Sequence, residues 1–222
     1  MKRICRYLPL PFLLLLSIPF ASAQSSVDFN VGFGTAHDKS TGAGIDNLNS
    51  ANAFGSCKVG AADPNCQATP ALSGFFMGVG GDVMLTKRYG FGIQAALQPA
   101  KADYGPLQFR EIFYDFNGIL APINQKKAIV KIEGGVGGAK TSFSYTQSSC
   151  VGTAVCSKQS QPVGSSNHFQ VHAGIGVQIF VTEHVFIRPQ FDFHYVPGLT
   201  DQFGSNMVPA AMVWLGYSLG DR

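Results

Sequence analysis

The sequence predicts an all-β chain folded as an eight-stranded, antiparallel, up-and-down β-barrel that crosses a membrane. Three observations carry this prediction. Apolar residues recur at every second position in eight segments, which is the period of a strand whose two faces differ. The linkers between these segments are alternately long and short. The faces opposite the apolar ones repeatedly carry glycine, as at Gly32, Gly78 and Gly216, where a crowded barrel interior needs small side chains.

The clearest pair of strands lies between His168 and Pro197. In its first half every odd position from Phe169 to Val181 is apolar, whereas the even positions are mostly glycine, glutamine and histidine. The alternation returns from Val185 to Tyr195, and Thr182-Glu183 between the halves predicts a tight turn. A polar face made for water would carry lysine and glutamate. The pattern therefore favours apolar side chains in lipid and polar ones inside, over a soluble lipocalin-like barrel with the opposite arrangement.

The other six strands show the same alternation. A tilted strand of about 9 to 13 residues is long enough to cross a bilayer. Pro189 lies within a strand and has no N–H to donate, which predicts a β-bulge nearby. The six strands are expected at residues 27–34, 74–86, 89–98, 112–120, 130–137 and 211–219.

The linkers predict how the barrel is oriented. Short turns are expected at 87–88, 122–127 and 182–183, and the two longest loops at about 37–71 and 146–167. Transmembrane barrels place short turns in the periplasm and long loops outside. An even number of strands then leaves both chain ends on the periplasmic side.

Residues 1–23 have the organisation of a cleaved secretory signal peptide. A basic start precedes an apolar centre from Leu8 to Phe20, and Ala21-Ser22-Ala23 supplies small residues for cleavage before Gln24. A membrane anchor is the alternative, but the apolar centre is short and interrupted by prolines. The expected mature chain, residues 24–222, is a single exported barrel domain.

Charge argues against nucleic acid as a partner. Without the three basic residues of the signal peptide, the 16 basic residues fall to 13, which equals the 13 acidic residues. A chain with no net positive charge has no electrostatic basis for binding a polyphosphate. Charged residues make up only 13% of the chain, against about 25% in typical soluble domains.

A family resemblance rests on three stretches. They are Gly174-x-Gly176, the run VQIFVTEHVFIRPQFDFHYV from Val177, and WLGYSLG from Trp214. This pattern resembles the small outer-membrane β-barrel family, which includes the membrane domain of outer membrane protein A and the opacity proteins. The resemblance implies a monomeric barrel in the bacterial outer membrane, surrounded by its lipids and inserted by the barrel-assembly machinery. One departure is that Leu219 stands where such barrels usually end on an aromatic residue.

Four cysteines remain after processing, and export places them in an oxidising compartment. Cys57 and Cys66 fall in the first long loop, and Cys150 and Cys156 in the second. Their short separations favour disulfides Cys57–Cys66 and Cys150–Cys156, with loop-to-loop pairing as the alternative. No metal is expected at these cysteines, because neither a two-residue spacing nor a nearby histidine accompanies them.

The predicted interior carries more acids than bases. Charges in so confined a space must be paired or hydrated. We expect a hydrogen-bonded ionic network that plugs the barrel, with Lys131 as neutraliser of Asp115 and Glu133; a narrow cation-favouring water path is the alternative. The predicted interior network consists of Asp82, Glu111, Asp115, Lys131, Glu133, Arg188, Asp192, His172 and His194, with Asp28 on the same face.

Two histidines of this network form a possible site of their own. If the hairpin closes at Thr182-Glu183, His172 lies opposite His194, with Asp192 two residues away. Such a group could bind a metal or titrate near neutral pH. Polar filling of the interior is the favoured interpretation, so neither a metal nor another cofactor is expected.

These features predict a non-enzymatic protein of the Gram-negative envelope, with a structural or surface-interaction role and at most a narrow, porin-like pore. An outer-membrane lipid-modifying enzyme is one alternative, because His168, His194 and loop serines lie near the predicted rim. No nucleophile stands at a definable spacing from them. A soluble secreted lipocalin-like binder is the other alternative.

Overall fold

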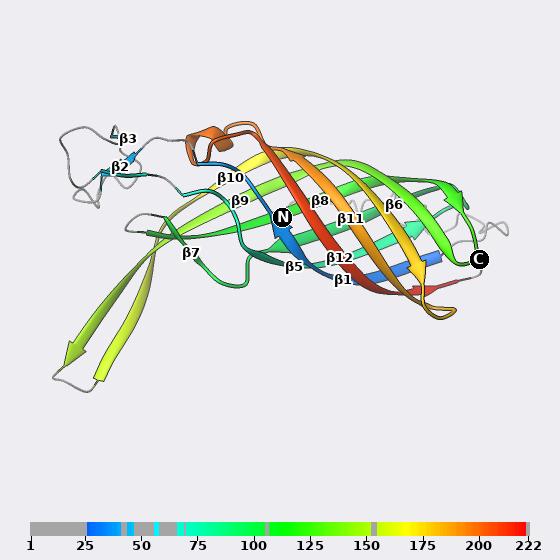
Figure 1. Cartoon of the computed structure of the whole chain (residues 1–222), viewed down its shortest axis with the longest axis horizontal. Coiled ribbons are helices and arrows are strands. Elements are labelled where there is room, and N and C mark those ends of the chain that lie inside the picture. Colours follow the sequence, from blue (N-terminus) through cyan, green and yellow to red (C-terminus); the bar gives the residue numbers. More distant parts are fainter. Residues whose placement is uncertain are drawn as a thin grey trace, which may run out of the picture.

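The computed structural model describes residues 26–40, 44–46, 56–57, 66–68, 70–104, 107–151 and 155–220, so the predicted signal peptide lies outside the described residues. Eight long strands, each antiparallel to its neighbours, form a barrel (Figure 1). They are β1 (Ser26–Ala36), β5 (Phe75–Met84), β6 (Tyr89–Leu97), β8 (Leu107–Asn124), β9 (Ala128–Val151), β10 (Val155–Phe180), β11 (Val185–Tyr195) and β12 (Met207–Leu219).

Short elements lie at the long-loop end. The strands β2 (Gly44–Asp46), β3 (Ser56–Cys57) and β4 (Cys66–Ala68) form a separate small sheet in the order β3-β2-β4. Strand β7 (Ala102–Tyr104) pairs with the start of β8, and the 3-10 helix η4 (Leu199–Asp201) lies in the β11–β12 loop. No helix among the described residues is long and apolar enough to span a membrane.

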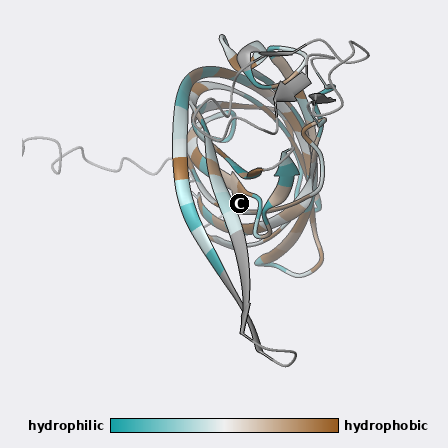
Figure 2. Ribbon diagram, turned by 90° about the vertical axis from the view of Figure 1, so that its left-hand side faces the viewer, coloured by the Kyte–Doolittle hydropathy of each residue, from teal (hydrophilic) through white to brown (hydrophobic). Residues whose placement is uncertain are grey.

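The barrel closes by two pairings that complete the ring. The chain runs as a meander, and β1 pairs with β12 from Val27↔Leu219 to Ala36↔Ala210. The second pairing joins β6 to β8, the two long strands on either side of the short strand β7 in the sequence. Figure 2 looks along the barrel from its long-loop end and shows the strands arranged in this ring. The predicted fold class is confirmed.

Burial separates the two faces of the strands. Along β11 exposed and buried side chains alternate without exception from Val185 to Tyr195. Apart from Phe186, the buried positions are polar, such as Arg188 and Asp192, so most apolar residues point outward. A soluble lipocalin-like barrel would bury its apolar face instead, and this alternative is wrong. Outward apolar residues that are 51–66% exposed include Phe29, Val79, Ile93, Phe116 and Ile175.

The segment 146–167, predicted as a loop, is instead mostly strand. β9 and β10 pair in one ladder from Val151↔Val155 to Ala128↔Ile179, so they form a hairpin arm that projects from the barrel (Figure 1). The prediction failed because neighbouring strands stop short of the arm: β8 pairs with β9 only as far as Ser144, and β11 with β10 only from Val171. A two-stranded ribbon has no buried apolar face and therefore lacks the alternation that reveals a strand.

The predicted bulge at Pro189 is also wrong. β11 pairs with β12 in an unbroken register through Pro189↔Val213. Toward β10 the ladder skips the positions around Pro189 and resumes in the same register at Ile179↔Ile187. The β10–β11 pairing therefore lacks a hydrogen bond at Pro189, but neither strand gains an extra residue. Register shifts occur elsewhere, between Leu120 and Ile123 and between Pro162 and Gly164, and the first carries β8 into the turn predicted at 122–127.

The inward glycines make room for large interior side chains. A Cβ at Gly32 would lie 2.6 Å from Cε3 of Trp214, and one at Gly78 would lie 2.5 Å from its Cη2. Gly216 faces the ring of Phe186 in the same way. These three glycines therefore sit where an eight-stranded barrel has no space for a side chain.

Candidate functional site in the barrel lumen

An apolar cap closes the long-loop end of the lumen. The rings of Tyr104 and Phe143 lie 5.1 Å apart, and those of Phe109 and Phe203 lie 5.2 Å apart. Leu199 of η4 is buried in the same cluster. The cap was not predicted, because Leu199 and Phe203 lie in a loop with no periodicity. The one feature of the sequence that could have indicated it is the presence of two large apolar residues in a short loop.

A hydrogen bond anchors the loop that carries the cap. The hydroxyl of Tyr104 donates to the carbonyl oxygen of Gln202 at 2.5 Å. Burial raises the pKa of Tyr104 to about 12, so this donor keeps its proton at all ordinary pH values. The β11–β12 loop is thereby tied to β7 across the mouth of the barrel.

Below the cap, two cations hold three carboxylates. Lys131 Nζ donates to Oδ2 of both Asp28 and Asp82 at 2.8 Å. Arg188 NH1 contacts Asp82 at 2.6 Å and Glu133 at 3.3 Å. All five side chains are almost completely buried. A charge removed from this network would leave an uncompensated partner in a low dielectric.

The expected role of Lys131 is therefore wrong in one respect. It binds Asp28 and Asp82, which face each other as partners on β1 and β5, rather than Asp115 and Glu133. Glu133 takes Arg188 as its cation. The alternation along a strand shows only that a side chain points inward; strand tilt decides which side chains meet across the lumen.

Interior amides complete the network, and sequence reasoning did not identify them. Gln94 donates to Glu133 at 2.5 Å, Gln178 to Asp28 at 3.1 Å and Gln190 to Asp192 at 2.8 Å. Gln170 donates to Asp115 at 2.5 Å. Their inward register was the available signal.

The histidine pair lies between this network and the cap. As predicted, His172 is directly opposite His194, and their rings stack with centroids 4.9 Å apart. His172 Nε2 lies 2.9 Å from Asp192 Oδ1, and its Nδ1 lies 2.9 Å from Asn117 Oδ1. His194 stacks on Phe113 and has its Nδ1 4.0 Å from Asp115 Oδ2, which is too long for a hydrogen bond.

Two residues singled out from the sequence take no part in the ionic network or the histidine pair. Glu111 is fully buried opposite Thr141, near the cap, and no described ion pair reaches it. His168 is only partly buried and lies beside Gly198, so it does not join the histidine pair.

Several solved structures of small outer-membrane barrels match this geometry along most of the chain. Ail, the attachment invasion locus protein of Yersinia pestis, in complex with the heparin analogue sucrose octasulfate, is 11% identical with a TM-score of 0.52, covering 88% of this chain and 99% of that one. The chain has the fold of the small outer-membrane β-barrels. Neisserial surface protein A is 10% identical with a TM-score of 0.48, covering 90% of this chain and 98% of that one. No protein-family model matches the chain, and no curated protein does.

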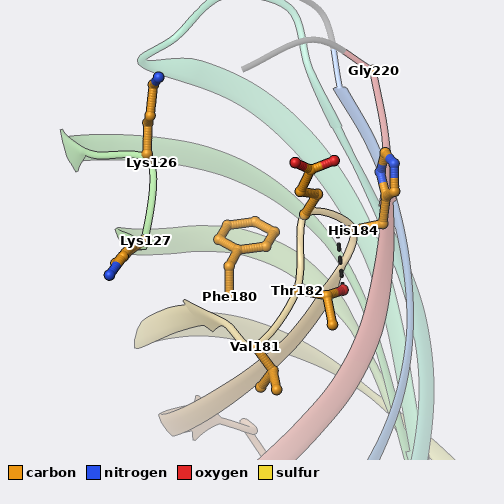
Figure 3. A pocket seen from close by; sticks show the side chains of 8 residues that line it. Lys126, Lys127, Phe180, Val181, Thr182, His184 and Gly220 are labelled. Carbon is orange, nitrogen blue, oxygen red and sulfur yellow. Dashed lines mark hydrogen bonds between the residues drawn. The ribbon is translucent and has the colours of Figure 1, made fainter.

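The short-turn end of the barrel is closed as well. Met84, Ile119, Ala121 and Ile129 form a second buried cluster, against which Phe180 packs. Outside it is an open hollow of about 430 Å³ between the β8–β9 and β10–β11 turns. Figure 3 shows Phe180 in the middle of this hollow, with Lys126, Lys127, Val181, Thr182, His184 and Gly220 around it. Glu183 also lines the hollow.

The four cysteines among the described residues lie on strands outside the barrel wall. Cys150 on β9 is the direct cross-strand partner of Cys156 on β10. Cys57 and Cys66 lie on β3 and β4, which flank β2 in the small sheet. Both disulfides stay predictions.

Proposed function

We propose that the protein is a closed barrel of the bacterial outer membrane with a structural and surface-interaction role. The observation that carries this proposal is the filled lumen, which is apolar at both ends and ionic in the middle. The outward apolar residues require lipid around the barrel. Cleavage after Ala23, insertion by the barrel-assembly machinery and a monomeric state belong to the same proposal.

The filled lumen argues against a porin-like role. An ion entering from the long-loop end would first have to displace Leu199 and Phe203, which are fully buried. Purified protein in planar bilayers should show no steady conductance, whereas the double substitution Leu199→Ser with Phe203→Ser should produce brief openings. Steady conductance steps from the unaltered protein would overturn the proposal of a closed barrel.

An enzymatic role has little support in the arrangement of its candidate residues. His194 is only 6% exposed and stacks between Phe113 and His172 beneath the cap. A lipid ester or acyl chain in the membrane could not reach this ring. Turnover of phospholipid or lipid A by the purified protein would reverse this conclusion.

Cations at the long-loop end support a surface-interaction role. Ala102 pairs with Phe109, which brings Lys101 toward Arg110, and Arg110 NH2 donates to the carbonyl oxygen of Pro99 at 3.0 Å. Lys140 lies on the outward face of the adjacent strand β9. Among the described residues, these three cations form no ion pair. A ligand that carries sulfate or phosphate groups fits such unpaired cations.

Sucrose octasulfate, the ligand named for Ail, is a suitable probe of this surface. We expect the unaltered protein to bind it in a salt-dependent manner, and the triple variant Lys101→Gln, Arg110→Gln and Lys140→Gln to bind at least tenfold more weakly. The matched control replaces Lys126 and Lys127, which lie at the opposite end. Equal binding by both variants would remove this surface from the proposal.

A further inference from the structure

We propose that His172, His194 and Asp115 bind one divalent transition-metal ion, of the Zn²⁺ class, inside the barrel. These residues come from β10, β11 and β8, and each offers one ligand atom such that all of these atoms lie within 4.8 Å of one another. All three residues are buried. Two imidazoles and a carboxylate form a donor set that Zn²⁺ accepts readily.

One nitrogen at this site lacks a partner. His194 Nδ1 has no hydrogen bond, although the residue is 94% buried, that is 6% exposed. A buried polar atom without a partner is costly, so a bound ion would remove this cost. The nitrogen lies 4.0 Å from Asp115 Oδ2. Tetrahedral Zn²⁺, with bonds of about 2.1 Å, holds two ligand atoms roughly 3.4 Å apart, so a small closing movement would let both atoms bind one ion.

His172 must give up one of its two hydrogen bonds to bind the ion, and the other can then hold its ring in place. One ring nitrogen faces Asp192 Oδ1 and the other faces Asn117 Oδ1, each at 2.9 Å. A metal-bound histidine usually keeps an oxygen acceptor at its second ring nitrogen. Whichever nitrogen of His172 takes the ion, an oxygen remains for the other.

Charge favours a cation at this level of the lumen. The interior holds six carboxylates, but both of its cations are occupied elsewhere: Lys131 by Asp28 and Asp82, and Arg188 by Asp82 and Glu133. Among the described residues, neither Asp115 nor Asp192 has a lysine or arginine partner, and the basic side chain paired with Asp192 is His172, which is neutral when it binds a metal. A divalent ion beside them would offset this local excess of negative charge.

There is also space for one ion. A cavity of about 20 Å³, lined in part by Asp115, Asp192 and His194, lies beneath the cap and is large enough for about one water-sized particle. The planes of the stacked rings of His172 and His194 differ by only 25°, so their nitrogen lone pairs lie in nearly parallel planes and do not converge on one point. At least one ring must turn toward the cavity when the ion binds. The bound ion would cross-link three strands.

The test uses the full mature barrel, refolded in detergent with Zn²⁺ or Co²⁺ and then freed of loose metal by dialysis. Loading during refolding matters because the closed cap blocks later entry. We expect one retained ion per chain by elemental analysis, and the visible absorption bands of tetrahedral Co²⁺. Retention should fall at least tenfold in His194→Gln and in Asp115→Asn. Only protein with the heat-dependent gel mobility of a folded barrel is counted.

The matched control is His184→Gln, because His184 is exposed in the β10–β11 turn and does not face the lumen. This variant should retain the ion fully. The temperature at which the folded band is lost should rise with metal in the unaltered protein and in His184→Gln, but not in His194→Gln. Absence of a retained ion from the unaltered protein would overturn the proposal, as would equal retention by the His194→Gln and His184→Gln proteins.

Discussion

Trp214 occupies the space that Gly32 leaves open, because a Cβ on Gly32 would lie 2.6 Å from Cε3 of the indole. The two residues are cross-strand partners on β1 and β12, where the first and last strands join. The closure of the barrel therefore depends on a large residue and a small one meeting in register.

Replacing this glycine should weaken the closure. We expect Gly32→Ala to lower the free energy of unfolding by about 1–3 kcal/mol, because the indole must shift within a packed interior. Urea unfolding in lipid vesicles measures this change. The control is Gly118→Ala, whose new Cβ would lie 3.7 Å from its nearest neighbour and should be nearly neutral. Equal losses in both variants would contradict the packing argument.

Removing the central cation should be more severe. Lys131→Met leaves Asp28 without its cation and Asp82 with Arg188 alone, so we expect a loss of about 3–5 kcal/mol or a failure to fold. Lys126→Met, in an exposed turn, should have no measurable effect. The fraction of heat-modifiable protein and its urea midpoint report the difference. An unchanged midpoint in Lys131→Met would show that the network does not support the barrel.

The two faces of β10 should respond oppositely to charge. Val177 faces outward, so Val177→Arg puts a charge into lipid, which costs about 2–4 kcal/mol at mid-bilayer and less toward the rim, and should block assembly. Gln178 is fully buried and donates to Asp28, so Gln178→Arg brings a cation to a carboxylate and should be better tolerated. The amount of folded barrel in the outer-membrane fraction is the measurement. Equal tolerance would contradict the inside–outside assignment.

The arm should be cross-linked by Cys150–Cys156. Directly opposed residues of an antiparallel pair have Cα atoms about 4.5–5.5 Å apart, which lies within the range a disulfide spans. Mass analysis of unreduced proteolytic fragments should find this pair, and Cys156→Ser should make the arm more sensitive to protease. A Cys150 joined instead to Cys57 or Cys66 would favour the loop-to-loop alternative.

The anchor of the cap should resist high pH. Burial raises the pKa of Tyr104 from its ordinary value of 10 to about 12. A raised pKa means that the contribution to stability is fully present below pH 10 and is lost as pH rises through about 12. Comparing tyrosinate absorption of the unaltered protein and Tyr104→Phe isolates this group from the other tyrosines. Ionisation of Tyr104 near pH 10 would show that the cap is open to water.

The alternation of apolar and polar residues was sufficient to predict the barrel, the inward position of every proposed network residue and the His172–His194 pairing. In each strand, successive side chains point alternately to lipid and to the lumen, so apolar and polar residues alternate in the sequence. The β9–β10 arm shows the limit, since residues 159–165 are all exposed and the pattern disappears there.

Contacts across the lumen were decided only by the tertiary structure. The choice of Asp28 and Asp82 as partners of Lys131, and the placing of Leu199 and Phe203 over the mouth, depend on strand tilt and on the path of a loop. Neither strand tilt nor the path of a loop produces a periodic pattern in the sequence. The sequence by itself determined which residues face inward, because that follows from the two-residue repeat of a strand; the closed barrel decided which of them touch, because a curved and tilted wall brings together side chains from strands far apart in the chain.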